Sequence, residues 1–353
     1  MAYSSIVKPS VYFNTKLISG NGGTQSLTGV GFKPDFTWIK SRSRVDPHSL
    51  TDIVRGVASQ LDSSLTSAPT THSDAITSFN SDGFSLGSQA DVNRSGTTFA
   101  SWNWLAGGSQ GSSNTAGSIN TTYTSVNTTA GFSISTYTGT GSAATIGHGL
   151  GVVPQVVLIK CTQRSENWTM YHKGLNASGA GTYIYLNTTA AAGGSGSNTS
   201  MFNNTAPTSS VFSVGADGAT NDTQTYIAYS FAEKKGYSKF GSYTGNGNAD
   251  GPFIYTGFKP AWVMIKRTDS TNNWIILDNK RDTDNPNNVE LQANSTNAED
   301  TSNIRLDMLS NGWKTRASTA ANNASSGTYI YMAFAEQPLV ANSGTDGVPA
   351  TAR

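Results

Sequence analysis

Hydrophobic and polar residues alternate along this chain in short runs that are separated by turn-forming residues. Phe36, Trp38 and Lys40 would share one face of an extended backbone, with the residues between them on the other face. Further along, Trp102 and Trp104 share a face in the same way. This alternation predicts β-strands, and we expect the aromatic pairs to lie in a hydrophobic core.

One pattern of residues occurs three times. Residues 31–40, with Pro34 before a hydrophobic run, recur as 151–160 and again as 257–266. Because proline cannot donate a ladder hydrogen bond, it should mark the start of a strand in each copy. A glycine turn precedes the pattern each time, and an aromatic strand closes the copy. The closing strands are expected at 99–104, 226–231 and 329–334. These landmarks in fixed order indicate one module that was copied twice.

Short strands and frequent turn residues predict an all-β fold. The Asp-Gly and Asn-Gly dipeptides at 82–83 and 311–312 are typical of tight type I′ hairpins. Residues 50–61 have the spacing of a short amphipathic helix. The match between 52–55 and 278–281 favours a strand followed by a loop instead, because 278–281 directly follows a strand-like run.

We therefore expect three tandem antiparallel β-sandwich domains of jelly-roll type. The expected boundaries are 1–106, 125–235 and 236–337, here called copies one, two and three, with a Gly/Ser/Asn-rich linker at 107–124 and an extended tail at 338–353. The linker composition predicts a flexible connection. Copies two and three, in contrast, are joined so closely that we expect them to form a nearly rigid pair.

The composition excludes several classes of function. Lysine plus arginine total 23 against 22 aspartate plus glutamate, a formal net charge of +1, so we expect no nucleic-acid binding. Hydrophobic residues at 36% are enough for packed cores and argue against wholesale disorder. The single cysteine, Cys161, excludes an internal disulfide and a cysteine-based zinc site. No stretch resembles a secretory signal or a membrane span, so we expect a soluble protein without membrane insertion.

Patterns that would indicate catalysis are weak. Residues 139–144 fit the dinucleotide fingerprint G-x-G-x-x-A, but a poor helix opening follows them, and we expect a hairpin turn there. Glu233 and Glu336 take matching places in two copies, which suits a structural role better than a glycosidase pair. The four histidines lack metal-ligand spacing and are expected at turns or on the surface; they are His48, His72, His148 and His172. We expect no catalytic residues, no cofactor and no enzymatic activity.

Aromatic residues outside the alternating pairs are the candidates for ligand contact. Sugar rings pack their apolar faces on exposed tryptophan or tyrosine. Trp168, Tyr171 and Trp274 follow the proline-led strands, where strand ends and loops can reach solvent. The alternative is that Trp168 and Trp274, which hold equivalent positions, are packing residues common to the copies.

Two acidic patterns remain. Asp282 and Asp284 lie in a run of oxygen-bearing side chains that is the best candidate for calcium, but the run lacks the glycine of an EF-hand loop. A solvated loop is the favoured interpretation, and no metal is expected. The Asp-x-x-Arg spacing at 52–55 and 278–281 would suit a local surface ion pair worth about 0–1 kcal/mol.

Four groups of residues carry a resemblance to a known family. They are 8–14 leading into 20–22, the Gly-Phe-Lys-Pro strand starts, 78–87, and 231–240. With these residues the sequence resembles a family of virion structural proteins of tailed phages, frequent in marine phages and described as tail-fibre-like. The resemblance covers nearly the whole chain and implies concanavalin-A-like sandwich domains in a virion, with no catalytic residues. Copy two departs from it, with Gly-Val-Val-Pro in place of Gly-Phe-Lys-Pro.

The leading hypothesis is a non-enzymatic phage virion protein, made in the host cytoplasm, that acts as a tail-fibre or receptor-binding component. Its expected partners are other virion proteins and a host surface polysaccharide. We also expect a homo-oligomer, with a trimer as one option. One alternative is a capsid decoration or tail accessory protein that binds only other virion subunits. A second alternative is a glycan-cleaving enzyme.

Overall fold

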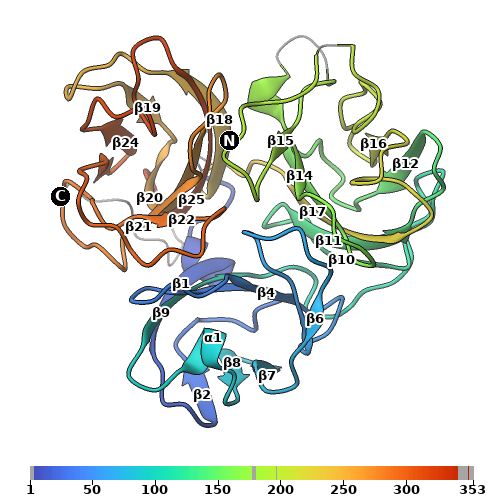
Figure 1. The fold of residues 1–353 in the computed structure, drawn as a ribbon, viewed down its shortest axis with the longest axis horizontal. Helices are drawn as coiled ribbons and strands as arrows, with labels where there is room; N and C mark the ends of the chain where they lie inside the picture. Colours follow the sequence, from blue (N-terminus) through green and yellow to red (C-terminus); the bar gives the residue numbers. More distant parts are fainter. Residues whose placement is uncertain (1–3, 177–179, 196, 341–348, 350–353) are drawn as a thin grey trace.

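The computed structural model describes residues 4–176, 180–195, 197–340 and 349 and shows an all-β protein built from antiparallel sheets, as predicted. Each copy of the sequence pattern contributes one larger sheet and at least one smaller sheet. The expected tail lies largely outside the described residues. In Figure 1 the copies surround a common centre, with copy one in blue and teal, copy two in green and yellow, and copy three in orange and red.

Copy one contains a four-stranded sheet and two smaller ones. The larger sheet has the order β1 (Phe13–Ser19), β9 (Thr98–Trp104), β3 (Phe36–Ser41) and β4 (Ser49–Asp52). The smaller sheets are β2 (Gln25–Thr28), β8 (Gly83–Leu86) and β7 (Ile76–Asn80), and the pair β5 (Ser59–Gln60) and β6 (Thr70–Thr71). Two short helices, η1 (Pro9–Val11) and α1 (Ala90–Asn93), complete this copy. Across 50–61 the predicted strand and loop are present, and the short strand β5 follows the loop.

Copies two and three repeat this order. Copy two has β10 (Tyr123–Asn127), β11 (Phe132–Thr138), β17 (Thr225–Phe231), β13 (Val156–Cys161), β14 (Thr169–His172) and β15 (Ile184–Tyr185), with β12 (Ala144–Gly147) paired to β16 (Val211–Val214) and η2 at Lys173–Leu175. Copy three has β18 (Ser238–Thr244), β25 (Thr328–Pro338), β20 (Phe258–Arg267), β21 (Ile275–Asp278) and β22 (Leu291–Gln292), with a small sheet of β19 (Phe253–Tyr255), β24 (Gly312–Thr315) and β23 (Leu306–Leu309). In every copy the strand before the glycine turn (β1, β11 or β18) pairs with the closing strand (β9, β17 or β25). The closing strand pairs in turn with the strand of the proline pattern (β3, β13 or β20).

Each strand of the proline pattern is buried on both faces, although Pro260 lies inside β20 and not at its start as expected. In β3 the side chain of Ile39 joins a core that lies between the larger and smaller sheets of copy one. Phe36 and Trp38 point to the opposite face and join a second core, which also contains residues of copies two and three. Copies two and three have their own inner cores in the same way. Strands β3, β13 and β20 are therefore buried along nearly their whole length, as is typical of strands covered on both sides.

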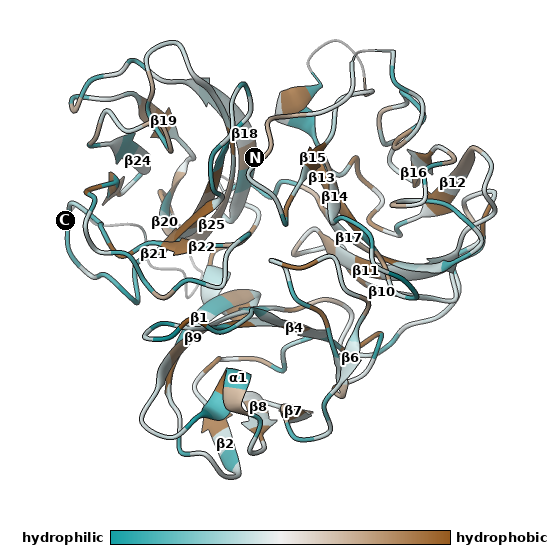
Figure 2. Ribbon diagram, viewed as in Figure 1, coloured by the Kyte–Doolittle hydropathy of each residue, from teal (hydrophilic) through white to brown (hydrophobic). Residues whose placement is uncertain are grey.

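The shared core is the centre of the molecule. Its aromatic rings come from all three copies: Trp104 stacks on Phe36 at 5.2 Å between ring centroids, and Trp262 lies edge-on to Trp104 at 5.9 Å. Phe36 in turn lies 4.7 Å from Tyr229. A small apolar cavity of about 20 Å³ remains among these side chains. Figure 2 shows hydrophobic colour on the larger sheets, β13 and β25 included, whereas the outer loops are mostly white or teal. The aromatic pairs predicted to be core are buried, but against neighbouring copies.

The glycine turns join the larger sheet of each copy to a smaller one instead of forming hairpins. The turn at Gly139 connects β11 to β12, which belong to different sheets, so the hairpin expected there is wrong. A side chain on Gly139 would collide with the carbonyl oxygen of Asp222, so only glycine fits. The side chain of Asn221, fully buried, holds the turn by accepting from Thr140 N and donating to Ser142 O. Asn93 and Asn323 hold the turns of the other copies in the same manner.

Both predicted hairpins exist, but their turns are not type I′. Gly83 and Gly312 begin the return strands β8 and β24 and pair in register with Asn80 and Leu309. The two residues between each pair have negative φ, whereas type I′ requires positive φ at both. Glycine is needed because a neighbouring strand lies close: a Cβ would collide with the carbonyl oxygens of Leu27 and Ile254, respectively.

The segment 107–124, expected to be a flexible linker, is packed against its neighbours. Ile119 is buried in the inner core of copy two and donates its backbone N–H to Thr145 O at 3.0 Å. The side chain of Gln110 donates to the carbonyl oxygen of Val54 in copy one at 2.7 Å. The segment therefore has defined contacts with copies one and two, although most of its residues are exposed.

Candidate functional site

The three aromatic residues predicted to contact a ligand are buried. Trp168, Tyr171 and Trp274 are 0%, 4% and 1% exposed, so the expectation that they reach solvent is wrong. Tyr171 packs edge-on against Phe202 in the inner core of copy two. The two tryptophans belong to the shared core, which corresponds to the alternative that they are packing residues.

Both tryptophans bond to the backbone of the preceding copy. The indole N–H of Trp168 donates to the carbonyl oxygen of Asp62 in copy one at 2.8 Å. The indole N–H of Trp274 donates to the carbonyl oxygen of Tyr185 in copy two at 2.9 Å. Each bond satisfies a buried backbone group at a contact between copies, so these residues act as anchors of the assembly.

His48 is the third member of this set. It follows Lys40 by the same eight residues that separate the equivalent lysines from Trp168 and Trp274. Its Nδ1 accepts from the indole of Trp38 at 2.7 Å, which places the proton on Nε2. Nε2 lies 3.0 Å from the carbonyl oxygen of Gln292 in copy three. Copy one thus receives a loop from copy three, and the three contacts close a ring.

Histidines expected at turns or on the surface are buried in three of four cases. His48, His148 and His172 are fully buried, and His72 is half-buried. Loss of hydration lowers the pKa of His48 to about 3 and that of His172 to about 4. His172 contacts the carbonyl oxygen of Tyr331 at 3.1 Å, another bond between copies. These neutral rings are structural hydrogen-bonding groups.

The two Asp-x-x-Arg pairs are also buried, so the surface ion pair predicted for them is wrong. Asp52 contacts Arg55 Nε at 2.6 Å and accepts a hydrogen bond from Tyr229 of copy two at 2.7 Å. Asp278 contacts Arg281 Nε at 2.5 Å and accepts from the indole of Trp102 in copy one at 3.0 Å. Each carboxylate is fully buried. Both pairs therefore join two copies, and their repetition reflects this shared position.

Three equivalent lysines are buried at the same boundaries: Lys40, Lys160 and Lys266. Lys160 donates to the carbonyl oxygen of Thr66 in copy one at 2.9 Å, and Lys266 donates to that of Thr189 in copy two at 3.0 Å. Lys40 donates to carbonyl oxygens within its own copy. Removal from water lowers the pKa of each ammonium group to about 8.

The free energy of unfolding should therefore rise between about pH 8 and pH 10. The lysine pKa is about 8 in the folded chain and 10.5 in its ordinary state, so the unfolded chain binds more protons in this window. Each lysine adds at most about 1.4 kcal/mol per pH unit. Buried tyrosines, whose pKa is raised, act in the opposite direction above pH 10. Urea unfolding across this range measures the slope, and Lys40→Met should lower it by about a third. A flat curve would contradict the prediction.

The candidate calcium loop has its own internal bonds. Asp282 accepts hydrogen bonds from the backbone N–H groups of Asp284 and Asn288 at 3.3 and 2.8 Å. Asp284 is exposed. Across the part of the chain that the structure describes, no three His, Cys, Asp or Glu side chains gather as metal ligands. The loop thus has the hydrogen bonding of a solvated turn.

The two glutamates expected in structural roles form salt bridges. Glu233 pairs with Lys239 at 3.1 Å, and Glu336 pairs with Lys259 at 2.9 Å. Glu233 also accepts from the backbone N–H of Phe240. Each of the two carboxylates is thus paired with a nearby lysine.

A cleft with a volume of about 550 Å³ lies between copies two and three. Copy two contributes Gly174 and Thr182, and copy three contributes the ends of β18, β20 and β25. Its walls carry several hydroxyl groups, of which Thr268 and Thr328 bond to each other at 2.7 Å. Asp269 lies on the copy-three wall, where Arg267 holds its carboxylate through two hydrogen bonds. That pairing keeps the pKa of Asp269 below its ordinary value.

A smaller cleft lies between copies three and one. It has a volume of about 130 Å³ and is lined by Lys280 of copy three and Thr15 of copy one. Val54, Gly174 and Lys280 are equivalent positions, fourteen residues after the repeated lysines. At the third junction, Gln110 contacts Val54. The three junctions therefore differ in the size of their clefts and in the residues that meet there.

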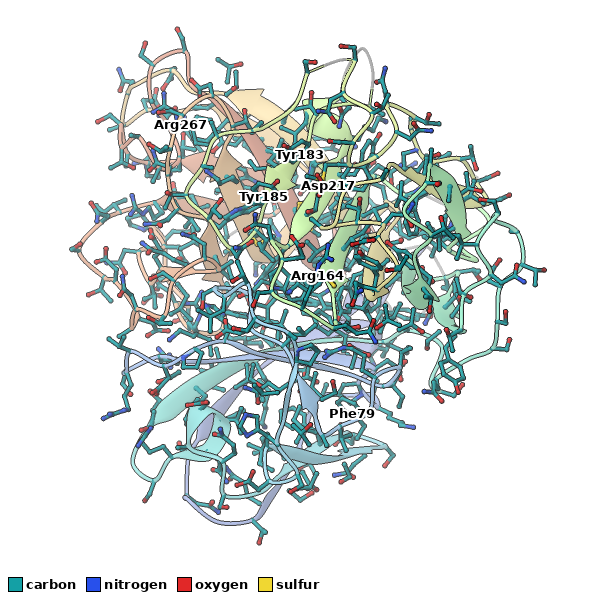
Figure 3. The ribbon with its side chains drawn as sticks, turned by 45° about the vertical axis from the view of Figure 1, so that its right-hand side comes forward. Phe79, Arg164, Tyr183, Tyr185, Asp217 and Arg267 are labelled. Atoms are coloured by element: carbon teal, nitrogen blue, oxygen red, sulfur yellow. The ribbon has the colours of Figure 1, made fainter. Side chains whose placement is uncertain are left out.

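The sequence analysis missed two pairs of partly or fully exposed aromatic residues. Tyr183 and Tyr185 are half-buried in copy two, 5.2 Å apart between ring centroids, and Figure 3 shows them beside Asp217. Phe253 and Tyr255 are 45% and 55% exposed in copy three. Both pairs flank an isoleucine, and this aromatic-Ile-aromatic alternation was the available signal.

No helix in the described ranges is long and apolar enough to span a membrane. A comparison with protein families matches residues 8–338 to a domain of unknown function, DUF7483. Comparisons with curated proteins and with solved structures find no significant match. Since the family match spans almost all of the chain, including all three copies, the chain belongs to the DUF7483 family.

Proposed function

We propose that this chain is a non-enzymatic structural protein of a tailed-phage virion, a tail-fibre or receptor-binding component that contacts host surface glycans. Each copy would be a β-sandwich domain of jelly-roll, concanavalin-A-like type. The resemblance of the sequence to tail-fibre-like proteins supports the virion role. Stacked antiparallel sheets around a separate inner core in each copy support the sandwich architecture.

The observation that carries glycan binding is the cleft between copies two and three. At about 550 Å³ it lies within the size range of small-molecule sites. Threonine and serine hydroxyls line it, and each can donate or accept a hydrogen bond, which matches the hydroxyl groups of a sugar. Leu175 and Ala192 add apolar surface for the ring. These are the features of a site for a neutral sugar.

The same cleft does not suit sugar hydrolysis. Glycosidases place two carboxyl groups on either side of the scissile bond. Among the residues that line the cleft, Asp269 is the single carboxylate, and Arg267 holds it. The geometry therefore favours binding over cleavage.

Thr268→Val should weaken binding of a neutral sugar about three- to tenfold, because one hydrogen-bonding hydroxyl is lost from the wall. The probes are trimers of glucose, galactose, mannose and N-acetylglucosamine, titrated calorimetrically into the full chain. Thr162→Val is the matched control: Thr162 bonds to Thr225 at 2.8 Å in copy two, as Thr268 bonds to Thr328 in copy three. Equal losses in both variants, or no binding of any probe by the unaltered chain, would refute this site.

The closed ring of copies favours a second candidate function, a capsid decoration or tail accessory protein that binds only other virion subunits. Three similar copies around one centre match a position of threefold symmetry, which virions contain. Cryo-electron microscopy of the particle would separate the candidates. Density for the chain on threefold positions of the head would support decoration, and density at the tail tip would support receptor binding.

A further inference from the structure

The outer edge of β1 in copy one has no partner strand among the described residues. β1 pairs with β9 on one side and is the last strand of its sheet on the other. The backbone groups of Tyr12 and Gly20 bond to residues that flank β9, at 2.9 and 2.8 Å. Because such bonds recur at every second residue of an antiparallel pair, the N–H and C=O groups of Thr15 and Leu17 point away from β9, toward the outer edge.

The other two copies cover the equivalent edge. Thr15, Ile134 and Phe240 hold equivalent places opposite the closing strands of copies one, two and three. In copy two, β10 lies along this edge as an added antiparallel strand, with Ser125 opposite Ile134 (Figure 1). In copy three, the turn 233–237 bonds to the backbone N–H of Phe240 at 2.9 Å. Copy one thus presents the backbone groups that a strand or a turn occupies in its two relatives.

The edge of β1 borders the cleft of about 130 Å³ between copies three and one, which Thr15 and Asn279 both line. Asn279 is 3% exposed, and neither its amide oxygen nor its amide nitrogen has a hydrogen-bond partner among the described residues. The hydroxyl of Thr15, a residue that is 6% exposed, has no partner there either. Buried polar groups without partners are unfavourable, so these groups indicate a ligand that both donates and accepts hydrogen bonds at this place.

Charge does not define this ligand. The carboxylate of Glu336, which also lines the cleft, is 2.9 Å from the ammonium group of Lys259. Lys280, on the opposite wall, is exposed to water. A peptide group presents an N–H and a C=O together, and these match both the edge of β1 and the amide of Asn279.

We propose that β1 binds an extended segment of another protein, which adds to the sheet of copy one as an antiparallel strand. The segment comes from another protein because β10, the strand of this chain that makes the same kind of pairing, is already bound to β11. Backbone groups of the segment bond to Thr15 and Leu17, and Asn279 bonds to a peptide group from the side. The proposal depends neither on the sugar cleft nor on the virion role.

The pairing in copy two indicates which side chains suit this edge. Ser125 of β10 lies opposite Ile134, the equivalent of Thr15, and Tyr123 lies opposite Thr136, the equivalent of Leu17. A segment with a small residue at one position and an aromatic residue two positions before it therefore fits.

The test uses a synthetic peptide with the sequence of residues 120–129, blocked at both ends and labelled with a fluorophore. Its anisotropy should rise saturably when the full chain is added. Leu17→Pro in the full chain should weaken binding about tenfold or more, because proline removes an edge N–H without removing a bond to β9. Leu17→Thr is the matched control: it keeps the N–H, supplies the residue found at the equivalent position of copy two, and should leave binding unchanged.

Asn279→Leu should weaken binding severalfold without lowering the melting temperature, because it removes a buried amide that has no partner in the folded chain. A purely structural Asn279 would instead make this variant melt earlier. Binding should change little with salt, since charge does not select the peptide. Circular dichroism confirms that each variant is folded.

Absence of saturable binding would overturn the proposal, as would binding that Leu17→Pro and Asn279→Leu both leave intact. Displacement of the peptide by the neutral sugar trimers would assign the cleft to a glycan instead. Sedimentation showing a dimer that Leu17→Pro abolishes would assign the edge to a second copy of this chain and likewise refute the proposal.

Discussion

Asp52→Ala should lower the free energy of unfolding by about 3–5 kcal/mol. The substitution leaves the guanidinium of Arg55 buried without its carboxylate and removes the acceptor of the Tyr229 hydroxyl. It also removes two hydrogen bonds to the backbone N–H groups of Val54 and Arg55. Urea unfolding, followed by tryptophan fluorescence, measures the loss.

Asp250→Ala is the control for this experiment. Asp250 pairs with Lys314 at 2.5 Å, but its side chain is 79% exposed, so its removal should change stability by less than about 1 kcal/mol. Asp278→Ala should cost less than Asp52→Ala, because Glu299 remains 3.3 Å from Arg281. Equal small effects for Asp52 and Asp250 would show that the buried pair does not hold copies one and two together.

Trp262→Ala should also cost about 3–5 kcal/mol, because it empties the centre of the shared core. Trp262 belongs to copy three, but its ring lies 5.9 Å from Trp104 and 6.3 Å from Phe13 of copy one. The loss of packing should therefore destabilise both copy one and copy three. Hydrogen exchange should speed up in β1 and β9 as well as in β20 and β25.

Trp313→Ala is the matched comparison, since Trp313 is fully buried in the inner core of copy three. It should cost a similar free energy, but its faster exchange should be concentrated in copy three. If Trp262→Ala spared copy one in the same way, the shared core would not couple the copies.

Much of the fold follows from local pattern. The alternation in residues 36–40 predicted a strand with Phe36 and Trp38 on one face, and the structure confirms both. The same reasoning could not say what that face packs against. The partner of Trp102 is Asp278, 176 positions away, and no local pattern in either segment specifies that pairing. The hydrophobic character of both faces of β3 was the available sign that each would be covered.

The prediction that the candidate site residues reach solvent was wrong for a related reason. Trp168 and Trp274 were placed at strand ends that could reach solvent. In the ring, the backbone of the preceding copy bonds to the indole of each of them. Counting from the repeated lysines would have aligned His48 with both tryptophans and favoured a packing role. The equivalence was hidden because imidazole and indole differ, although each donates an N–H to a carbonyl oxygen.

Closing the ring within a single polypeptide has an evolutionary consequence. Three identical subunits would be obliged to carry three identical recesses, and any mutation would alter all of them at once. Here each junction is encoded separately, so Gln110 can bond to Val54 at one while another keeps a cleft of about 550 Å³. Tandem duplication thus lets the residues of one junction change while those of the other two stay the same.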